Sequence, residues 1–91
     1  MILQCKILCF DKQSEENGIE PEEIWVNCCI DLGQVAAIKE DITADLVVVP
    51  DTTIIYLTNG REMIVNVPYN ILSARWIKAK QIQMFTGEQF N

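Results

Sequence analysis

Apolar and polar residues alternate over several short stretches of the chain, which is typical of half-buried β-strands. Residues 2–10 and 24–31 each place alternate apolar side chains on one face of a strand. Residues 35–39 and 46–49 predict two further strands, and the second of these ends at Pro50, which cannot donate a hydrogen bond to a sheet.

Residues 52–67 carry the strongest local signal, two β-rich runs separated by Asn59-Gly60. This dipeptide predicts a two-residue type I′ turn, in which both turn residues have positive φ. The resulting register places the larger apolar group on one face, which we assign to the core: Ile54, Tyr56, Met63, Val65 and Val67. The opposite face keeps a smaller apolar group: Ile55, Leu57 and Ile64. Apolar side chains on both faces predict a closed, sandwiched or oligomeric sheet.

After Pro68 the apolar period changes from two to that of a helix, so we expect an amphipathic helix over residues 69–83. Its apolar stripe contains Ile71, Leu72, Trp76, Ala79 and Ile82. Residues 11–23 hold six acidic side chains, an Asn-Gly and a proline, and are expected to form a solvated acidic loop. Residues 88–91 are expected to be a loose tail.

Together these elements predict one α+β domain over residues 1–91. About five to six mostly antiparallel strands would curl into a small β-barrel or a strongly bent sheet, with one C-terminal amphipathic helix. The length suffices for one core. Apolar residues make up 49 % of the chain and charged residues 22 %, close to the globular average.

The net charge of −6 is unevenly distributed. Residues 1–51 carry three basic side chains against eleven acidic ones, and residues 52–91 carry four basic against two acidic. Nucleic acids attract clustered Lys and Arg side chains, so an acidic chain makes a poor general nucleic-acid binder. The alternative function is therefore a nucleic-acid-binding regulator that uses one local basic group on the hairpin and helix: Arg61, Arg75, Lys78 and Lys80.

The chain has four cysteines and no histidine, which excludes Ser-His-Asp and Cys-His catalysis. The acidic pairs fall in polar connections, where both carboxyl groups of a pair would be solvated and neither would be tuned for acid–base work, so we expect no enzyme and no cofactor. Cys5 and Cys9 would lie roughly 13 Å apart along a strand. Two thiolates on one zinc lie only about 4 Å apart, so we expect no metal site. Reduced core cysteines are the simplest interpretation, and a cross-strand disulfide of Cys28 with either Cys5 or Cys9 stays open.

No apolar run approaches the roughly 20 residues that a membrane-spanning helix needs. The first ten residues contain Lys6 and no small-residue cleavage site, which argues against a signal peptide. We therefore expect a cytoplasmic protein without membrane contact.

Trp25 lies on the strand face opposite Ile24 and Val26, and tryptophan is enriched among binding anchors. The competing interpretation is that the C-terminal helix or the acidic loop covers it. We predict a non-catalytic protein-interaction or assembly module that binds a protein partner or a second copy of itself. Its interaction surface would contain Trp25, Ile55, Leu57 and Ile64.

Three phrases follow one another between Trp25 and Arg75: WVNCCIDLGQVAAIKE, PDTTIIYLTNGRE and MIVNVP. In this respect the chain resembles the flagellar FlbD-like (SwrD-like) family of small bacterial and phage proteins. The resemblance covers a little over half of the chain and implies a compact antiparallel β unit with a C-terminal helix. It supplies no catalytic residues. This sequence adds an N-terminal strand with the acidic loop, and the insertion ITADLVVV before Pro50.

Overall fold

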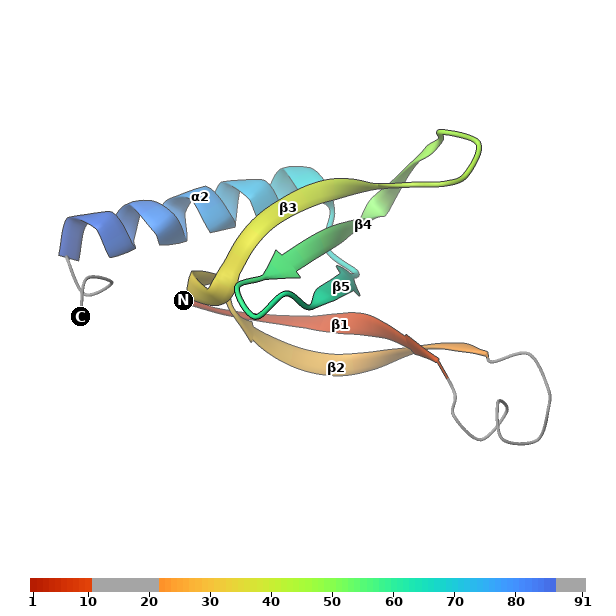
Figure 1. Ribbon diagram of the computed structural model, residues 1–91, viewed down its shortest axis with the longest axis horizontal. Helices are drawn as coiled ribbons and strands as arrows, with labels where there is room; N and C mark the ends of the chain where they lie inside the picture. The colour runs from red at the N-terminus through yellow and green to blue at the C-terminus, as the bar shows by residue number, and fades with distance from the viewer. Residues whose placement is uncertain (11–21, 87–91) are drawn as a thin grey trace.

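The computed structural model describes residues 1–10 and 22–86, so most of the predicted acidic loop and the whole predicted tail lie outside the described residues. The described chain forms an antiparallel sheet, one 3-10 turn and one C-terminal helix, which confirms the α+β class (Figure 1). The elements are β1 (Ile2–Phe10), β2 (Glu23–Asp31), η1 (Leu32–Gln34), β3 (Val35–Ile42), β4 (Val48–Leu57), β5 (Glu62–Val65) and α2 (Tyr69–Thr86).

The five strands have the spatial order β2-β1-β5-β4-β3. The two edge strands, β2 and β3, are consecutive in the chain and are joined only by η1. The sheet must therefore bend until both edges start from one corner, and from there the β1–β2 and β3–β4 hairpins diverge (Figure 1). The edges do not pair, so the predicted bent sheet is present and the predicted barrel is wrong.

The corner at η1 is held by local and helical contacts. The Asp31 carboxylate accepts a hydrogen bond from the Gly33 N–H at 2.9 Å, which caps the turn. From α2, the Trp76 indole donates to the Val35 carbonyl and the Lys80 ammonium donates to the Gly33 carbonyl, both at 3.0 Å. These bonds seat the helix across the corner that joins the two hairpins.

The core lies between α2 and the concave side of the sheet. Its buried members come from every element: Leu3, Ile30, Leu32, Val35, Ile55, Val65, Leu72 and Ala79. Of the predicted helix stripe, Leu72, Trp76 and Ala79 face this core, whereas Ile71 and Ile82 are exposed. The helix also continues past residue 83 to Thr86.

The turn of the β4–β5 hairpin differs from the prediction. Thr53 pairs with Val65 and Ile55 pairs with Met63, which leaves three residues in the turn instead of two. The Leu57 N–H donates to the Arg61 carbonyl at 2.8 Å, and only Gly60 in this turn has a positive φ, of 86°. This is a three-residue loop with glycine in the left-handed position.

The change of register by one residue regroups the side chains, because neighbouring strand residues point to opposite faces. Ile55 and Leu57 join Met63 and Val65 on the core face. Ile54, Tyr56 and Ile64 lie on the other side, which we call the second face. The predicted grouping of Ile54 and Tyr56 with Met63 and Val65 on one face is therefore wrong, although Ile54 is itself buried.

We expect Gly60→Ala to destabilise the protein by about 1 kcal/mol, because a side chain strains the left-handed backbone while open space surrounds the position. The melting temperature should fall by roughly 4–8 °C in a thermal melt. Gly60→Asn is the matched control, since asparagine tolerates this conformation better than alanine. Its melting temperature should fall less. Equal melting temperatures for all three proteins would contradict this turn geometry.

Candidate interaction surface

The structure separates the four residues predicted for the interaction surface. Ile55 is 1 % exposed in the core, and the half-buried Leu57 packs against the same cluster, so neither lies on the second face. Trp25 is 42 % exposed, and Ile64 is half-buried on the second face. Two of the four residues therefore stay available, and both lie on the second face.

The joint between β1 and β5 explains why this face is hollowed. The two strands pair at a single register position, Ile7 with Val65. Beside it the Asn66 N–H donates to the Lys6 carbonyl at 3.0 Å, and the Asn66 side-chain oxygen accepts from the Lys6 N–H at 2.7 Å. Because the ladder does not continue, the β1–β2 hairpin and the β4–β5 hairpin part on either side of this joint.

One hollow beside the joint has a volume of about 440 Å³ and is mainly apolar. We call it the seam groove, and its lining residues are Ile7, Leu8, Phe10, Arg61, Glu62, Met63 and Ile64. Leu8 lies directly opposite Trp25 in the β1–β2 ladder. Trp25 and Ile64 thus belong to one apolar surface, connected through Leu8.

Leu8 and Phe10 were not predicted as interaction residues. Phe10 is 58 % exposed. Both occupy even positions of β1, on the same strand face as the polar Gln4 and Lys6. The available signal was that alternation fails at these two positions, where apolar residues stand on the otherwise polar face.

The second face is better covered on the β3–β4 side. The Lys39 ammonium lies 5.6 Å from the centre of the Tyr56 ring, a cation–π contact. Ile54 is paired with Lys39 and is buried. The uncovered part of the face is therefore the part around the seam groove.

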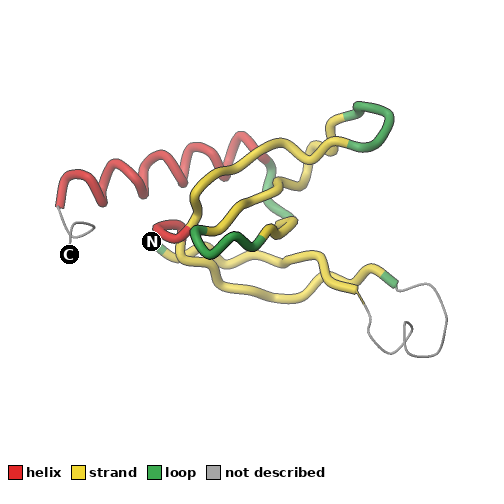
Figure 2. The backbone as a smooth tube through the Cα atoms, in the orientation of Figure 1, coloured by secondary structure: helices red, strands yellow, loops and turns green. Residues whose placement is uncertain are grey.

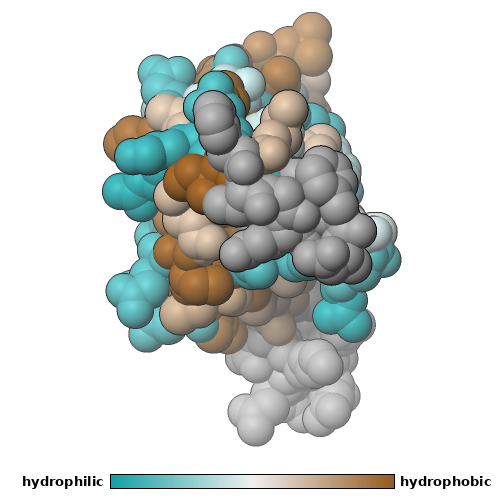
Figure 3. Space-filling model, turned by 90° about the vertical axis from the view of Figure 1, so that its left-hand side faces the viewer, coloured by the Kyte–Doolittle hydropathy of each residue, from teal (hydrophilic) through white to brown (hydrophobic). Residues whose placement is uncertain are grey.

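Further exposed apolar residues lie at the tip of the β3–β4 hairpin: Ile42, Leu46, Val47 and Val48. Leu46 is 83 % exposed and has a positive φ of 63°, in a turn closed by a hydrogen bond from its N–H to the Thr43 carbonyl. At the opposite end of the molecule, Figure 3 shows a band of apolar side chains beside polar ones.

The molecule is also extended for its length. Its radius of gyration is 15.3 Å and its extents are 50 × 29 × 20 Å. A compact chain of this size would have a radius of gyration of about 12 Å. The hairpins diverge from the corner at η1 while α2 projects towards the other side (Figure 2), and the hairpin strands hold much of the exposed apolar surface.

The predicted basic group is not one uniform surface. The Lys80 ammonium donates a hydrogen bond to the Gly33 carbonyl. Arg75 and Lys78 are exposed on neighbouring turns of α2, and Arg61 is exposed after the hairpin turn. Two adjacent cations on the helix are a small site for a phosphate backbone.

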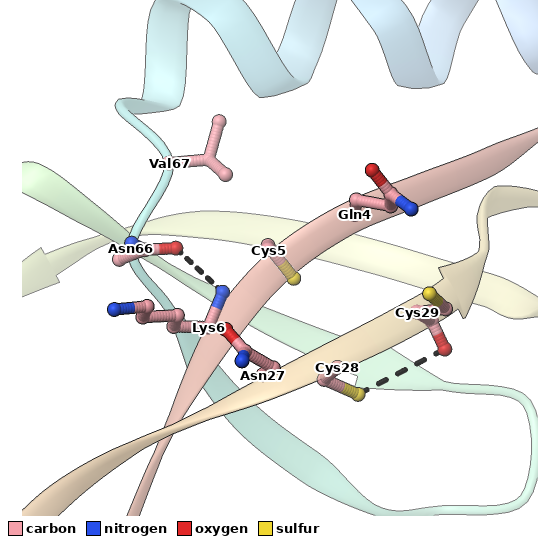
Figure 4. Close-up of a pocket in the computed structure, with 8 residues that line it drawn as sticks. All are labelled: Gln4, Cys5, Lys6, Asn27, Cys28, Cys29, Asn66 and Val67. Atoms are coloured by element: carbon pink, nitrogen blue, oxygen red, sulfur yellow. Dashed lines mark hydrogen bonds between the residues drawn. The ribbon is translucent and has the colours of Figure 1, made fainter.

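The cysteines gather at a second hollow beside the joint, of about 720 Å³ (Figure 4). Cys5, Cys28 and Cys29 line it together with Lys6, Asn66 and three other residues. Burial raises the pKa of the Cys5 thiol, and the neighbouring Cys28 and Cys29 thiols raise it further. All four cysteines are reduced. Within residues 1–10 and 22–86, no three His, Cys, Asp or Glu side chains are placed to hold a metal ion.

Comparisons with known proteins found no match: no protein-family profile, no curated protein and no solved structure is similar to this chain. The resemblance to the FlbD-like family therefore stays a prediction. Over the described part of the chain, no helix combines the length and apolar character needed to cross a bilayer.

Proposed function

We propose that this protein is a non-catalytic assembly module that associates through the second face around the seam groove. The observation that carries the proposal is the apolar surface beside the seam groove, formed by the exposed Trp25 and Phe10 and the half-buried Leu8 and Ile64. Exposed aromatic and aliphatic side chains around a hollow are typical of protein interfaces.

The proposed partner is a second copy of the chain. The extended shape supports it, because each subunit leaves apolar hairpin surface that a neighbour would bury. Both sheet edges, β2 and β3, also end the sheet without a further strand in the described chain. Open edges readily pair with another chain.

Static light scattering tests self-association. We expect the mass to rise from 10.4 kDa towards twice that value as the concentration passes through the micromolar range. Trp25→Ala should shift the half-point of this rise by about tenfold or more, since truncating an interface tryptophan typically costs over about 1–2 kcal/mol.

Ile77→Ala is the matched control, because Ile77 is an exposed apolar residue on α2 and lies outside the proposed surface. It should leave the concentration dependence unchanged. A mass of one subunit at all concentrations up to about 100 μM would contradict self-association, since a half-point in the micromolar range would already give mostly dimer at this concentration.

A further inference from the structure

The β1–β2 ladder decides which cysteine lies next to Cys28. Cys5 stands directly opposite it, whereas Cys9 is opposite Ile24 and Cys29 is opposite Gln4. Cα atoms of directly opposed antiparallel residues lie roughly 4.5–5.5 Å apart. A disulfide spans Cα separations of about 4.4–6.8 Å, so the backbone already has a suitable spacing.

We propose that Cys5 and Cys28 form a reversible cross-strand disulfide by exchange with a low-molecular-weight disulfide such as glutathione disulfide. The Cys28 thiolate attacks one sulfur of glutathione disulfide, which forms a mixed disulfide and releases one glutathione thiolate. Cys5 loses its proton to water, and its thiolate attacks the Cys28 sulfur and releases the second glutathione. Two protein thiols are oxidised, and one glutathione disulfide is reduced to two thiols.

The order of attack follows from the surroundings of the two thiols. Both are half-buried and line the same open hollow, through which glutathione can approach (Figure 4). Burial raises the pKa of the Cys5 thiol, which keeps this thiol protonated and makes it a poor first nucleophile. Once Cys28 carries the mixed disulfide, its sulfur is the nearest target for Cys5.

The hydrogen-bond pattern defines the kind of ladder position that Cys5 and Cys28 occupy. The Met1 carbonyl accepts from Leu32 beyond β2, whereas the Lys6 carbonyl accepts from Asn66 beyond β5. Odd residues of β1 therefore turn their backbone groups towards β2, and Cys5 and Cys28 form a hydrogen-bonded pair. Such pairs have a Cα separation of about 5.5 Å, which lies within the range that a disulfide spans, so the bond can form without a change in strand spacing.

Tryptic mapping without reductant tests the proposal and does not depend on the proposed function. Trypsin places Cys5 in peptide 1–6, Cys9 in peptide 7–12, and Cys28 with Cys29 in peptide 13–39. After incubation with excess glutathione disulfide, we expect peptides 1–6 and 13–39 to be joined, two hydrogen atoms lighter than their sum. Dithiothreitol should return both peptides to their reduced masses.

Cysteine-to-serine variants show which of the two cysteines in peptide 13–39 forms the bond. Cys29→Ser and Cys9→Ser should oxidise like the parent, whereas Cys28→Ser and Cys5→Ser should give no joined peptide. The oxidised parent should also melt roughly 10 °C higher than the reduced form, because the bond closes a loop of about 24 residues.

Three results would overturn the proposal. The first is a link from peptide 7–12 to peptide 13–39, and the second is a bond inside peptide 13–39. The third is a full set of free thiols after prolonged incubation of the folded parent protein with glutathione disulfide. Since the mapping uses the parent protein, a variant that fails to fold leaves all three results measurable.

Discussion

Replacing Leu72 by alanine is expected to lower the free energy of unfolding by about 2–5 kcal/mol. Leu72 is fully buried and contributes the α2 side chain at the centre of the core cluster. Its removal leaves a cavity between the helix and the sheet, and the bonds of Trp76 and Lys80 to the corner limit how far the helix can move to fill it. Domains of this size have a free energy of unfolding of about 5–15 kcal/mol, so this loss is a large share of the total stability.

Urea denaturation measures this loss, with the midpoint falling and the slope unchanged. Ile71→Ala is the matched control, because Ile71 is the preceding helical residue and is 49 % exposed. Ile71→Ala should lower the free energy of unfolding by less than about 1 kcal/mol, since the truncated side chain buries little apolar surface on folding. Similar losses for the two variants would mean that the helix presents a different face to the sheet.

Most of the secondary structure was predictable because period-two and helical patterns are local properties of the chain. The strands around residues 2–10, 24–31 and 52–67 and the helix after Pro68 all form close to their predicted positions. The closure of the sheet was not predictable in this way. Whether β2 and β3 meet depends on how far the sheet bends at η1, and this is set by contacts from α2 far along the chain.

The hairpin register failed for a related reason. Asn59-Gly60 suits both a two-residue turn and a three-residue turn with glycine in the left-handed position. The longer turn is fixed by contacts that the local pattern does not contain. The Thr58 N–H donates to the Gln34 carbonyl at 2.8 Å, and its hydroxyl donates to the Gln34 side-chain oxygen at 3.0 Å. These bonds tie the turn to η1.

The register error carried over to the candidate site. Trp25 was placed by strand periodicity and Ile64 by the predicted hairpin register, and both lie on the second face. Ile55 and Leu57 were grouped with Ile64 through the two-residue turn, so the additional turn residue moved both to the core and left Ile64 on the second face. Leu8 joined the surface through its pairing with Trp25, a contact that only the β1–β2 register specifies.

Ile55→Ala and Ile64→Ala distinguish the two registers in solution. With a two-residue turn, both side chains would lie on the face with the smaller apolar group. Truncating either one would then lower the free energy of unfolding by a similar amount. In the observed register Ile55 is buried beside Val65, whereas Ile64 lines the seam groove. We therefore expect Ile55→Ala to cost about 2–5 kcal/mol, and Ile64→Ala to cost clearly less, about 1–2 kcal/mol.

Urea denaturation below the concentration at which the protein self-associates keeps the comparison free of interface effects. If Ile55→Ala fails to fold, Ile55→Val should still cost about 0.5–1.5 kcal/mol, more than Ile64→Val at the half-exposed position. If the alanine variants lose equal stability, and the valine variants do as well, Ile55 must lie on the second face with Ile64. The seam groove would then be flanked by a larger apolar surface than the one on which the proposed function rests.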